Sequence, residues 1–166
     1  DIKPANVLIN MEGAVKVADF GLAKMDDPAN TAGLTKSGMS MGTPDFVAPE
    51  ALTLGALVDH RADLYAVGVM LYQMLTGMLP YFSPNPAEIE RMVSQGRCTA
   101  PRVRNSRISK ELSDIVMKAM APDLTVRYLS ASELLEDLQT AADIDVDGDG
   151  LADVYAARLF VPACSD

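Results

Sequence analysis

The sequence predicts a mainly α-helical domain that carries a small β-hairpin near its N-terminal end. Two short apolar segments flank a turn close to the start, and a long uncharged run lies in the middle of the chain. Later segments combine helix-capping residues with apolar residues at helical spacing. With 166 residues, of which 49% are apolar and 22% charged, the chain is long enough for one domain with a sizeable core.

The hairpin is predicted by two β-rich segments, residues 7–9 ("VLI") and 14–18 ("AVKVA"), joined by the turn "NMEG". Residues 21–42 follow as a long loop that is rich in Gly, Ser, Thr, Asp and Asn and shows no periodicity. Loops of this length in a compact domain are usually functional or disordered. The loop carries several hydroxyl side chains, among them those of Thr31, Thr35, Ser37 and Ser40.

The uncharged run, residues 64–87, raises the question of a membrane span. Gln73, Thr76, Gly77 and Pro80 interrupt it, and the uninterrupted apolar part is shorter than the ~20 residues that a span needs. A helix that is apolar on all sides is otherwise a buried core helix. We therefore expect a core helix over residues 64–75 and no transmembrane segment in this chain.

Three further helices are predicted. One begins at Asn85, where Pro86 suits the first helical position and Glu88 completes the spacing of a capping box. Another covers "KELSDIVMKAM" and has an apolar core face made of Leu112, Ile115, Val116, Ala119 and Met120. The last begins at Ser130, and Glu133 again matches a capping box.

Charge and cysteine content exclude some classes of function. A net charge of −9 disfavours a nucleic-acid partner, which needs a basic surface. Arg102, Arg104 and Arg107 form only a loose cluster, interpreted as a solvated loop rather than a docking patch. The two cysteines, Cys98 and Cys164, are too few for a disulfide framework, so a reducing, cytoplasmic location is expected.

A group of residues around the hairpin has the chemistry that phosphoryl transfer needs, which is charge neutralisation and in-line positioning. An aspartate such as Asp1 can accept the proton of an attacking hydroxyl, and the Lys3 ammonium can neutralise phosphoryl charge. The Asn6 amide and the Asp19 carboxylate are hard oxygen ligands that suit Mg²⁺. A hairpin places these two side by side, because Asn6 enters its first strand and Asp19 follows its second.

These residues belong to a set of motifs that is specific only in combination. "DIKPANVLI" opens the chain, "DFG" follows at residues 19–21, and "GTPDFVAPE" occupies residues 42–50. In this order and spacing the sequence resembles the eukaryotic-type serine/threonine protein kinases, from the catalytic loop to the end of the activation segment. "VDHRADLYAVGVML" is similar to the central helix of the kinase C-lobe, particularly in bacterial members. Lys3 together with Thr43 is the serine/threonine pattern.

The resemblance covers residues 1–141 and implies a kinase C-lobe that uses ATP and Mg²⁺ to phosphorylate protein Ser/Thr hydroxyls. It implies Asp1 as the catalytic base and Lys3 as the phosphate-contacting cation. Asn6 and Asp19 become Mg²⁺ ligands, and Leu8 lies under the adenine ring. Thr43 bridges towards Asp1 and Lys3.

Other implied roles are structural. Asp63 anchors the catalytic loop from the start of the core helix, and the sole histidine, His60, is treated as structural. Glu50 and Arg127 form a buried ion pair that fixes the activation segment to the C-lobe.

The sequence departs from the family at its beginning. The N-lobe, with its Gly-rich loop, strand lysine and helix glutamate, is absent, as are the histidine and arginine that normally precede Asp1. We therefore expect this chain to be inactive alone and the intact parent to be the kinase. The alternative is a pseudokinase or a regulatory protein-interaction module.

The composition changes at residue 142, and residues 142–166 form an acidic tail. "DVDGDGLAD" resembles the calcium loops of EF-hand-like and thrombospondin-type repeats, with candidate ligands Asp145, Asp147, Asp149 and Asp153. The twelfth loop position is Ala156 rather than the usual glutamate, and a frame that starts at Asp143 fits no better. Weak Ca²⁺ binding and a solvated acidic turn both remain open.

Overall fold

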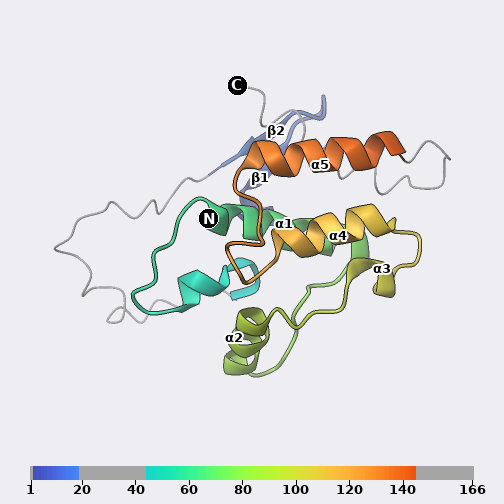
Figure 1. The fold of residues 1–166 in the computed structure, drawn as a ribbon. Helices are drawn as coiled ribbons and strands as arrows, with labels where there is room; N and C mark the ends of the chain where they lie inside the picture. The colour runs from blue at the N-terminus through green and yellow to red at the C-terminus, as the bar shows by residue number, and fades with distance from the viewer. Residues whose placement is uncertain (1, 19–43, 145–166) are drawn as a thin grey trace.

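The structure is a computed structural model that describes residues 2–18 and 44–144 (Figure 1). It begins with a single turn of 3-10 helix, η1 (Pro4–Asn6), and the strands β1 (Val7–Ile9) and β2 (Val15–Val17). Two further 3-10 turns follow, η2 (Pro44–Phe46) and η3 (Pro49–Leu52). The remaining elements are α1 (Arg61–Thr76), α2 (Pro86–Gln95), α3 (Pro101–Arg104), α4 (Lys110–Ala119) and α5 (Ala131–Ile144). The predicted mainly helical fold with one small hairpin is confirmed.

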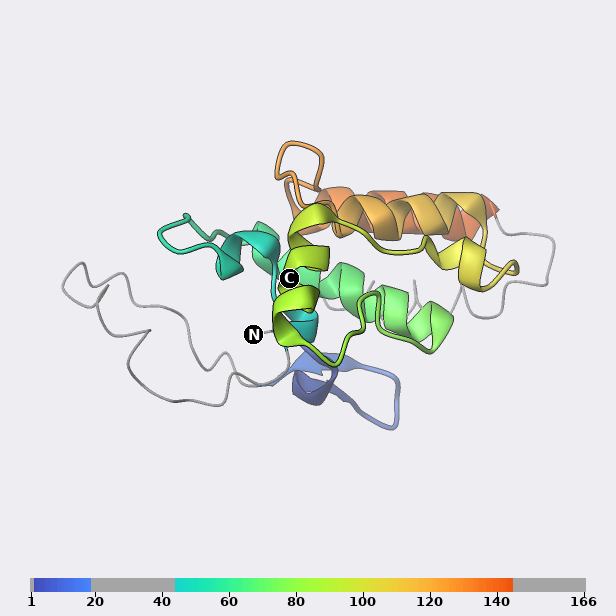
Figure 2. The ribbon, with the colours of Figure 1, turned by 90° about the horizontal axis from the view of Figure 1, so that it is seen from below.

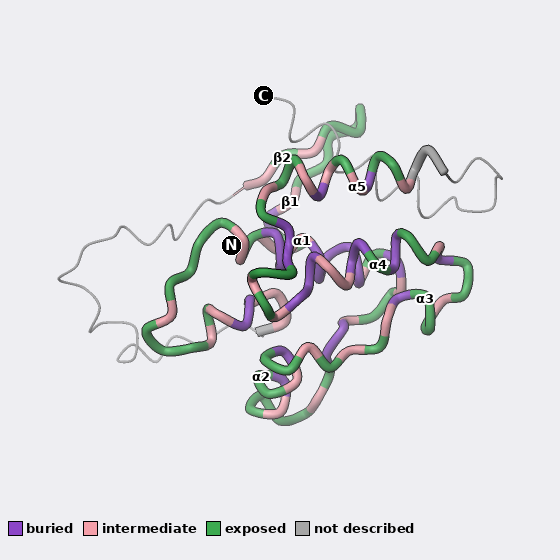
Figure 3. The backbone as a smooth tube through the Cα atoms, viewed as in Figure 1, coloured by how far each residue is buried: buried purple, intermediate pink, exposed green. Residues whose placement is uncertain are grey.

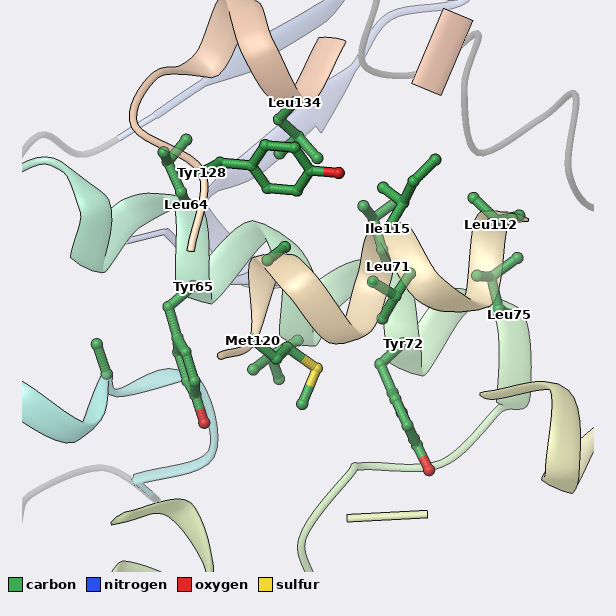
Figure 4. Packing of buried hydrophobic residues seen from close by; sticks show 14 of the residues in the cluster. Leu64, Tyr65, Leu71, Tyr72, Leu75, Leu112, Ile115, Met120, Tyr128 and Leu134 are labelled. Carbon is green, nitrogen blue, oxygen red and sulfur yellow. The ribbon is translucent and has the colours of Figure 1, made fainter. Parts of the chain in front are cut away.

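Helix α1 forms the centre of the domain. Figure 2 shows α4 and α5 on one side of α1 and the hairpin on the other. The α1 residues Tyr65, Val69, Leu71 and Tyr72 are fully buried, and Figure 3 shows that burial is concentrated on α1 and α4. Figure 4 shows side chains of α1 meeting those of α4, together with Tyr128 and Leu134. The uncharged run is thus a core helix as predicted, and no helix in the described ranges is long and apolar enough to cross a membrane.

The contact between α1 and α4 depends on Gly68. A Cβ atom at this position would lie 2.9 Å from the Ala119 Cβ and 2.9 Å from the Met120 Cγ. Real Cβ atoms essentially never approach other heavy atoms below 3.0 Å. Only glycine therefore lets α4 lie this close to the central helix.

The hairpin is antiparallel, with Val7 opposite Val17 and Ile9 opposite Val15. Its turn is organised by Asn10, whose Oδ1 accepts hydrogen bonds from the Ala14 N–H at 2.7 Å and the Glu12 N–H at 3.0 Å. Gly13 adopts a φ of 84°, in the left-handed region that glycine enters without steric cost. The side-chain amide and the glycine together explain why the chain reverses here.

The predicted helix caps are confirmed in part. Asn85 Oδ1 accepts a hydrogen bond from the Ala87 N–H, and Ser130 Oγ accepts one from the Glu133 N–H. A capping box also needs a hydrogen bond from the backbone N–H of the capping residue to the glutamate side chain. Neither helix forms this second bond, so that part of the prediction is wrong. Glu88 bonds the Arg91 guanidinium instead, and Glu133 accepts a hydrogen bond from the Leu129 N–H. In both cases another donor lies within reach of the glutamate.

The segment around Arg102 and Arg104 was predicted as a loop, and this is wrong for residues 101–104, which form the single turn α3. The Arg104 Nε donates a hydrogen bond to the Tyr72 hydroxyl at 2.5 Å. That hydroxyl donates in turn to the Thr99 carbonyl at 2.8 Å. Contacts with the core therefore hold a helix that is too short to show periodicity.

Replacing Ser109 by alanine is expected to lower the free energy of unfolding by about 1 kcal/mol. The Ser109 Oγ accepts a hydrogen bond from the Leu112 N–H at 3.1 Å and caps α4, the helix that packs on the core. Urea unfolding followed by circular dichroism measures the change. The matched control is Ser106→Ala, which removes an exposed hydroxyl three residues earlier. Equal stability of the two variants would contradict this role.

Candidate active site

The base of the hairpin holds Asn6 in a fixed position. The Asn6 N–H donates to the Lys3 carbonyl at 2.9 Å, which closes η1, and the Asn6 carbonyl accepts a hydrogen bond from the Ala18 N–H at 2.7 Å. Asn6 is only 7% exposed, although it is polar. The residue that precedes Asp19 is thus bonded directly to Asn6, in accordance with the predicted hairpin geometry.

Only part of the predicted site lies in the described ranges. Lys3, Asn6 and Leu8 are described, and the turn η1 brings Lys3 and Asn6 together. The other predicted residues lie outside these ranges, namely Asp1, Asp19 and Thr43 of the active site and Asp145, Asp147, Asp149 and Asp153 of the tail. Their roles stay predictions.

Leu8 lies in β1 opposite Lys16 and is 57% exposed. The neighbouring Ile9 and Met11 are exposed as well, so this end of the hairpin presents an apolar surface. A branched aliphatic side chain of this kind can pack against the face of a planar ring. The predicted place of Leu8 beneath an adenine stays a prediction.

The predicted ion pair between Glu50 and Arg127 is confirmed. The Arg127 Nη1 lies 2.7 Å from Glu50 Oε1, and its Nη2 lies 3.0 Å from Glu50 Oε2. This two-pronged geometry is the strong form of a charge-assisted hydrogen bond. The side chain of Arg127 is 0% exposed and that of Glu50 is 9% exposed, so both charges are removed from water. The pair ties η3, at the end of the predicted activation segment, to the loop before α5.

Arg127 also joins elements that sequence reasoning did not connect. Its Nε donates to the Ala121 carbonyl at 2.9 Å and its Nη1 donates to the Arg61 carbonyl at 2.9 Å. Its guanidinium lies 5.1 Å from the centre of the Tyr65 ring. Every residue has a backbone carbonyl, so the sequence does not show which carbonyls accept hydrogen bonds from Arg127. The only sequence signal for a buried cation near α1 was Tyr65, an aromatic residue in the uncharged run.

The start of α1 is fixed by polar contacts. Asp59 accepts hydrogen bonds from both the backbone N–H and the guanidinium of Arg61, and these lower the pKa of Asp59 to about 2. The His60 Nε2 lies 2.8 Å from the Leu129 carbonyl, which supports the structural role expected for the histidine. These contacts orient the turn that carries Asp63, whose predicted anchoring of the catalytic loop stays a prediction.

Comparison with known proteins identifies the family. Residues 1–138 match the family described as the protein kinase domain. A probable serine/threonine-protein kinase of Clostridium perfringens is 37% identical over 139 residues, which are 84% of this chain and 20% of that protein. A probable serine/threonine-protein kinase PknB of Bifidobacterium longum is 40% identical over 141 residues, 84% of this chain and 20% of that protein.

The serine/threonine-protein kinase PknB of Mycolicibacterium smegmatis is 35% identical over 139 residues, 83% of this chain and 22% of that protein. The chain thus spans about a fifth of the length of the curated relatives that it matches. The hairpin, the core helix and the Glu50–Arg127 pair lie within the matched residues. The chain belongs to the protein kinase family.

Proposed function

We propose that the parent of this chain transfers the γ-phosphate of ATP to serine or threonine hydroxyls of proteins. In this proposal residues 1–141 supply the catalytic loop and the lobe that receives the substrate, in a reducing, cytoplasmic compartment. The observation that carries the proposal is the hydrogen bond from the Ala18 N–H to the Asn6 carbonyl. It holds Asn6 beside the point where the chain continues into Asp19.

The donor set at this point fits Mg²⁺. Asn6 offers an amide oxygen from a backbone fixed on both sides, and Asp19 adds a carboxylate; both are hard oxygen ligands. A bound Mg²⁺ would neutralise charge on the phosphate oxygens.

The remaining residues act on the phosphate and the substrate. Lys3, one turn before Asn6, would bring its ammonium to the phosphoryl oxygens. Asp1 would accept the proton of the attacking hydroxyl, and Thr43 would help to place that hydroxyl. Leu8 would support the adenine ring through its exposed apolar face.

The proposal is tested by phosphotransfer from radiolabelled ATP to a library of Ser/Thr peptides, with the parent protein including the residues upstream of Asp1. Loss of a general base typically costs 10²–10⁴-fold in rate, so Asp1→Asn is expected to reduce transfer by roughly 10³-fold. Asp19→Ala is expected to reduce transfer to background. The 166-residue chain alone is expected to show no transfer above its own Asp19→Ala variant.

The matched control is Asp114→Asn, which removes an exposed carboxylate on α4. It is expected to leave the rate unchanged. Full activity of Asp19→Ala in the parent would contradict the proposal. Binding of ATP by the parent without any phosphotransfer would favour the alternative, a pseudokinase or a regulatory protein-interaction module.

A further inference from the structure

A basic surface lies at one end of this acidic chain. Residues 101–110 contain four cationic side chains and no carboxylate, whereas the whole chain has a net charge of −9. The four are Arg102, Arg104, Arg107 and Lys110, all of them exposed, and we call them the basic surface. Arg102 and Arg104 lie in α3 rather than in the solvated loop that the sequence suggested.

The backbone of the basic surface is fixed to the core. The Arg102 N–H donates to the Ser113 Oγ at 3.4 Å, and the Asn105 Nδ2 donates to the Leu75 carbonyl at 3.4 Å. Asn105 Oδ1 accepts a hydrogen bond from the Arg107 N–H at 3.1 Å. A fixed backbone limits the entropy that is lost when a partner binds the exposed side chains.

Two of the cations on the basic surface, Arg102 and Arg107, have no carboxylate near them in the described part of the chain. Lys110 pairs with Asp114 at 2.6 Å, which raises the pKa of Lys110, while the charge of Arg102 acts against that rise. Within residues 2–18 and 44–144, no carboxylate lies within ion-pair distance of the Arg102 or Arg107 guanidinium. The described part of the chain therefore leaves these two cations for another partner.

The acidic tail starts at the same end of the molecule. Lys118, near the end of α4, contacts Glu133 and Asp137 in the first half of α5, so the two helices run antiparallel. Figures 1 and 2 both show the end of α5 on the side where α3 and the start of α4 lie. The tail leaves α5 after Ile144 and contains Asp145, Asp147, Asp149 and Asp153 before its first basic residue, Arg158.

We propose that the acidic segment 145–153 docks on the basic surface of the same chain. Nine residues can span up to about 30 Å when extended, which is about twice the ~15 Å length of α4, the helix that runs antiparallel to α5. Because the segment is covalently attached, its effective concentration at the surface is in the millimolar range. Exposed ion pairs contribute only about 0–1 kcal/mol each, so docking needs several of them and weakens with salt.

A spin label on the tail tests this proposal in the 166-residue chain. The two native cysteines are removed by Cys98→Ser and Cys164→Ser, and a nitroxide is attached to a new cysteine introduced by Ala152→Cys. NMR then measures how strongly the nitroxide broadens each backbone amide signal. At an ionic strength of about 0.02 M we expect the amides of residues 102–112 to broaden most strongly, and to recover at about 0.5 M. Arg102→Glu with Arg107→Glu is expected to abolish the broadening.

The matched control is Lys16→Glu with Arg91→Glu, which changes the net charge equally at exposed positions outside the basic surface. It is expected to leave the broadening intact. A further variant exchanges the charges by adding Asp147→Arg and Asp149→Arg to the Arg102→Glu, Arg107→Glu protein. This exchange is expected to restore the broadening. Uniform broadening, or broadening that does not respond to salt, would overturn the proposal. A free acidic peptide that shifts these amides while the tail does not broaden them would also overturn it, and would identify a partner in trans.

Discussion

Replacing Arg127 by leucine is expected to lower the free energy of unfolding by about 3–5 kcal/mol. The substitution leaves the Glu50 carboxylate buried without its counter-charge, and the Ala121 and Arg61 carbonyls lose their donor. Such a loss is a large part of the total stability of a domain, commonly about 5–15 kcal/mol. Urea unfolding of the 166-residue chain measures it.

Two further variants show whether the pair is the cause. Arg127→Lys keeps the charge but not the planar fork that bonds both carboxylate oxygens, so we expect it to recover little of the loss. Glu50→Leu combined with Arg127→Leu is expected to be more stable than Arg127→Leu alone, because no charge is left buried. The control is Arg91→Ala, which breaks an exposed pair with Glu88. A loss below about 1 kcal/mol for Arg127→Leu would contradict the assigned role.

Replacing Gly68 by leucine is expected to destabilise the domain by at least about 3 kcal/mol, because the added atoms must occupy space already filled by Ala119 and Met120. Gly68→Ala sets two effects against each other. Alanine favours a helix by about 1 kcal/mol over glycine, but its Cβ would lie 2.9 Å from two side-chain atoms of the neighbouring segment. We expect the steric effect to dominate, so even this small change lowers stability.

Thermal unfolding of both Gly68 variants checks this prediction. Met74→Leu is the matched control, because it changes a half-exposed side chain of the same helix with little change of volume. Its melting temperature is expected to stay close to that of the unchanged chain. If Gly68→Leu melts at the same temperature as the control, α1 and α4 are not in tight contact at this point.

Much of the fold could be predicted from the sequence because its signals are local. The hairpin turn depends on Asn10 and Gly13, and the caps of α2 and α5 depend on Asn85 and Ser130, all within a few residues of the groups they bond. Helix α3 gave no such signal, since four residues are too few to show a period. It is held by Tyr72 and Ser113, which are distant in sequence.

The candidate site was less accessible to local reasoning. The hairpin alone places Asn6 beside Ala18, which required only the pattern of strand and turn. The Glu50–Arg127 pair joins residues 77 positions apart, and no local pattern pairs them; the expectation came from the resemblance to protein kinases. Glu88 and Glu133 also could not be assigned from local spacing. The spacing places each glutamate near the backbone N–H of the capping residue, but it does not show that Arg91 or the Leu129 N–H donates to the glutamate instead.

The 77-residue separation of Glu50 and Arg127 also has a consequence for the way the chain is made. At roughly 5–20 residues per second, the ribosome adds Arg127 about 4–15 s after Glu50. Throughout that interval the carboxylate has no counter-charge to be buried with, so η3 cannot settle against the rest of the domain. Docking of η3 on the loop before α5 must therefore follow the synthesis of Arg127, however early the local elements form.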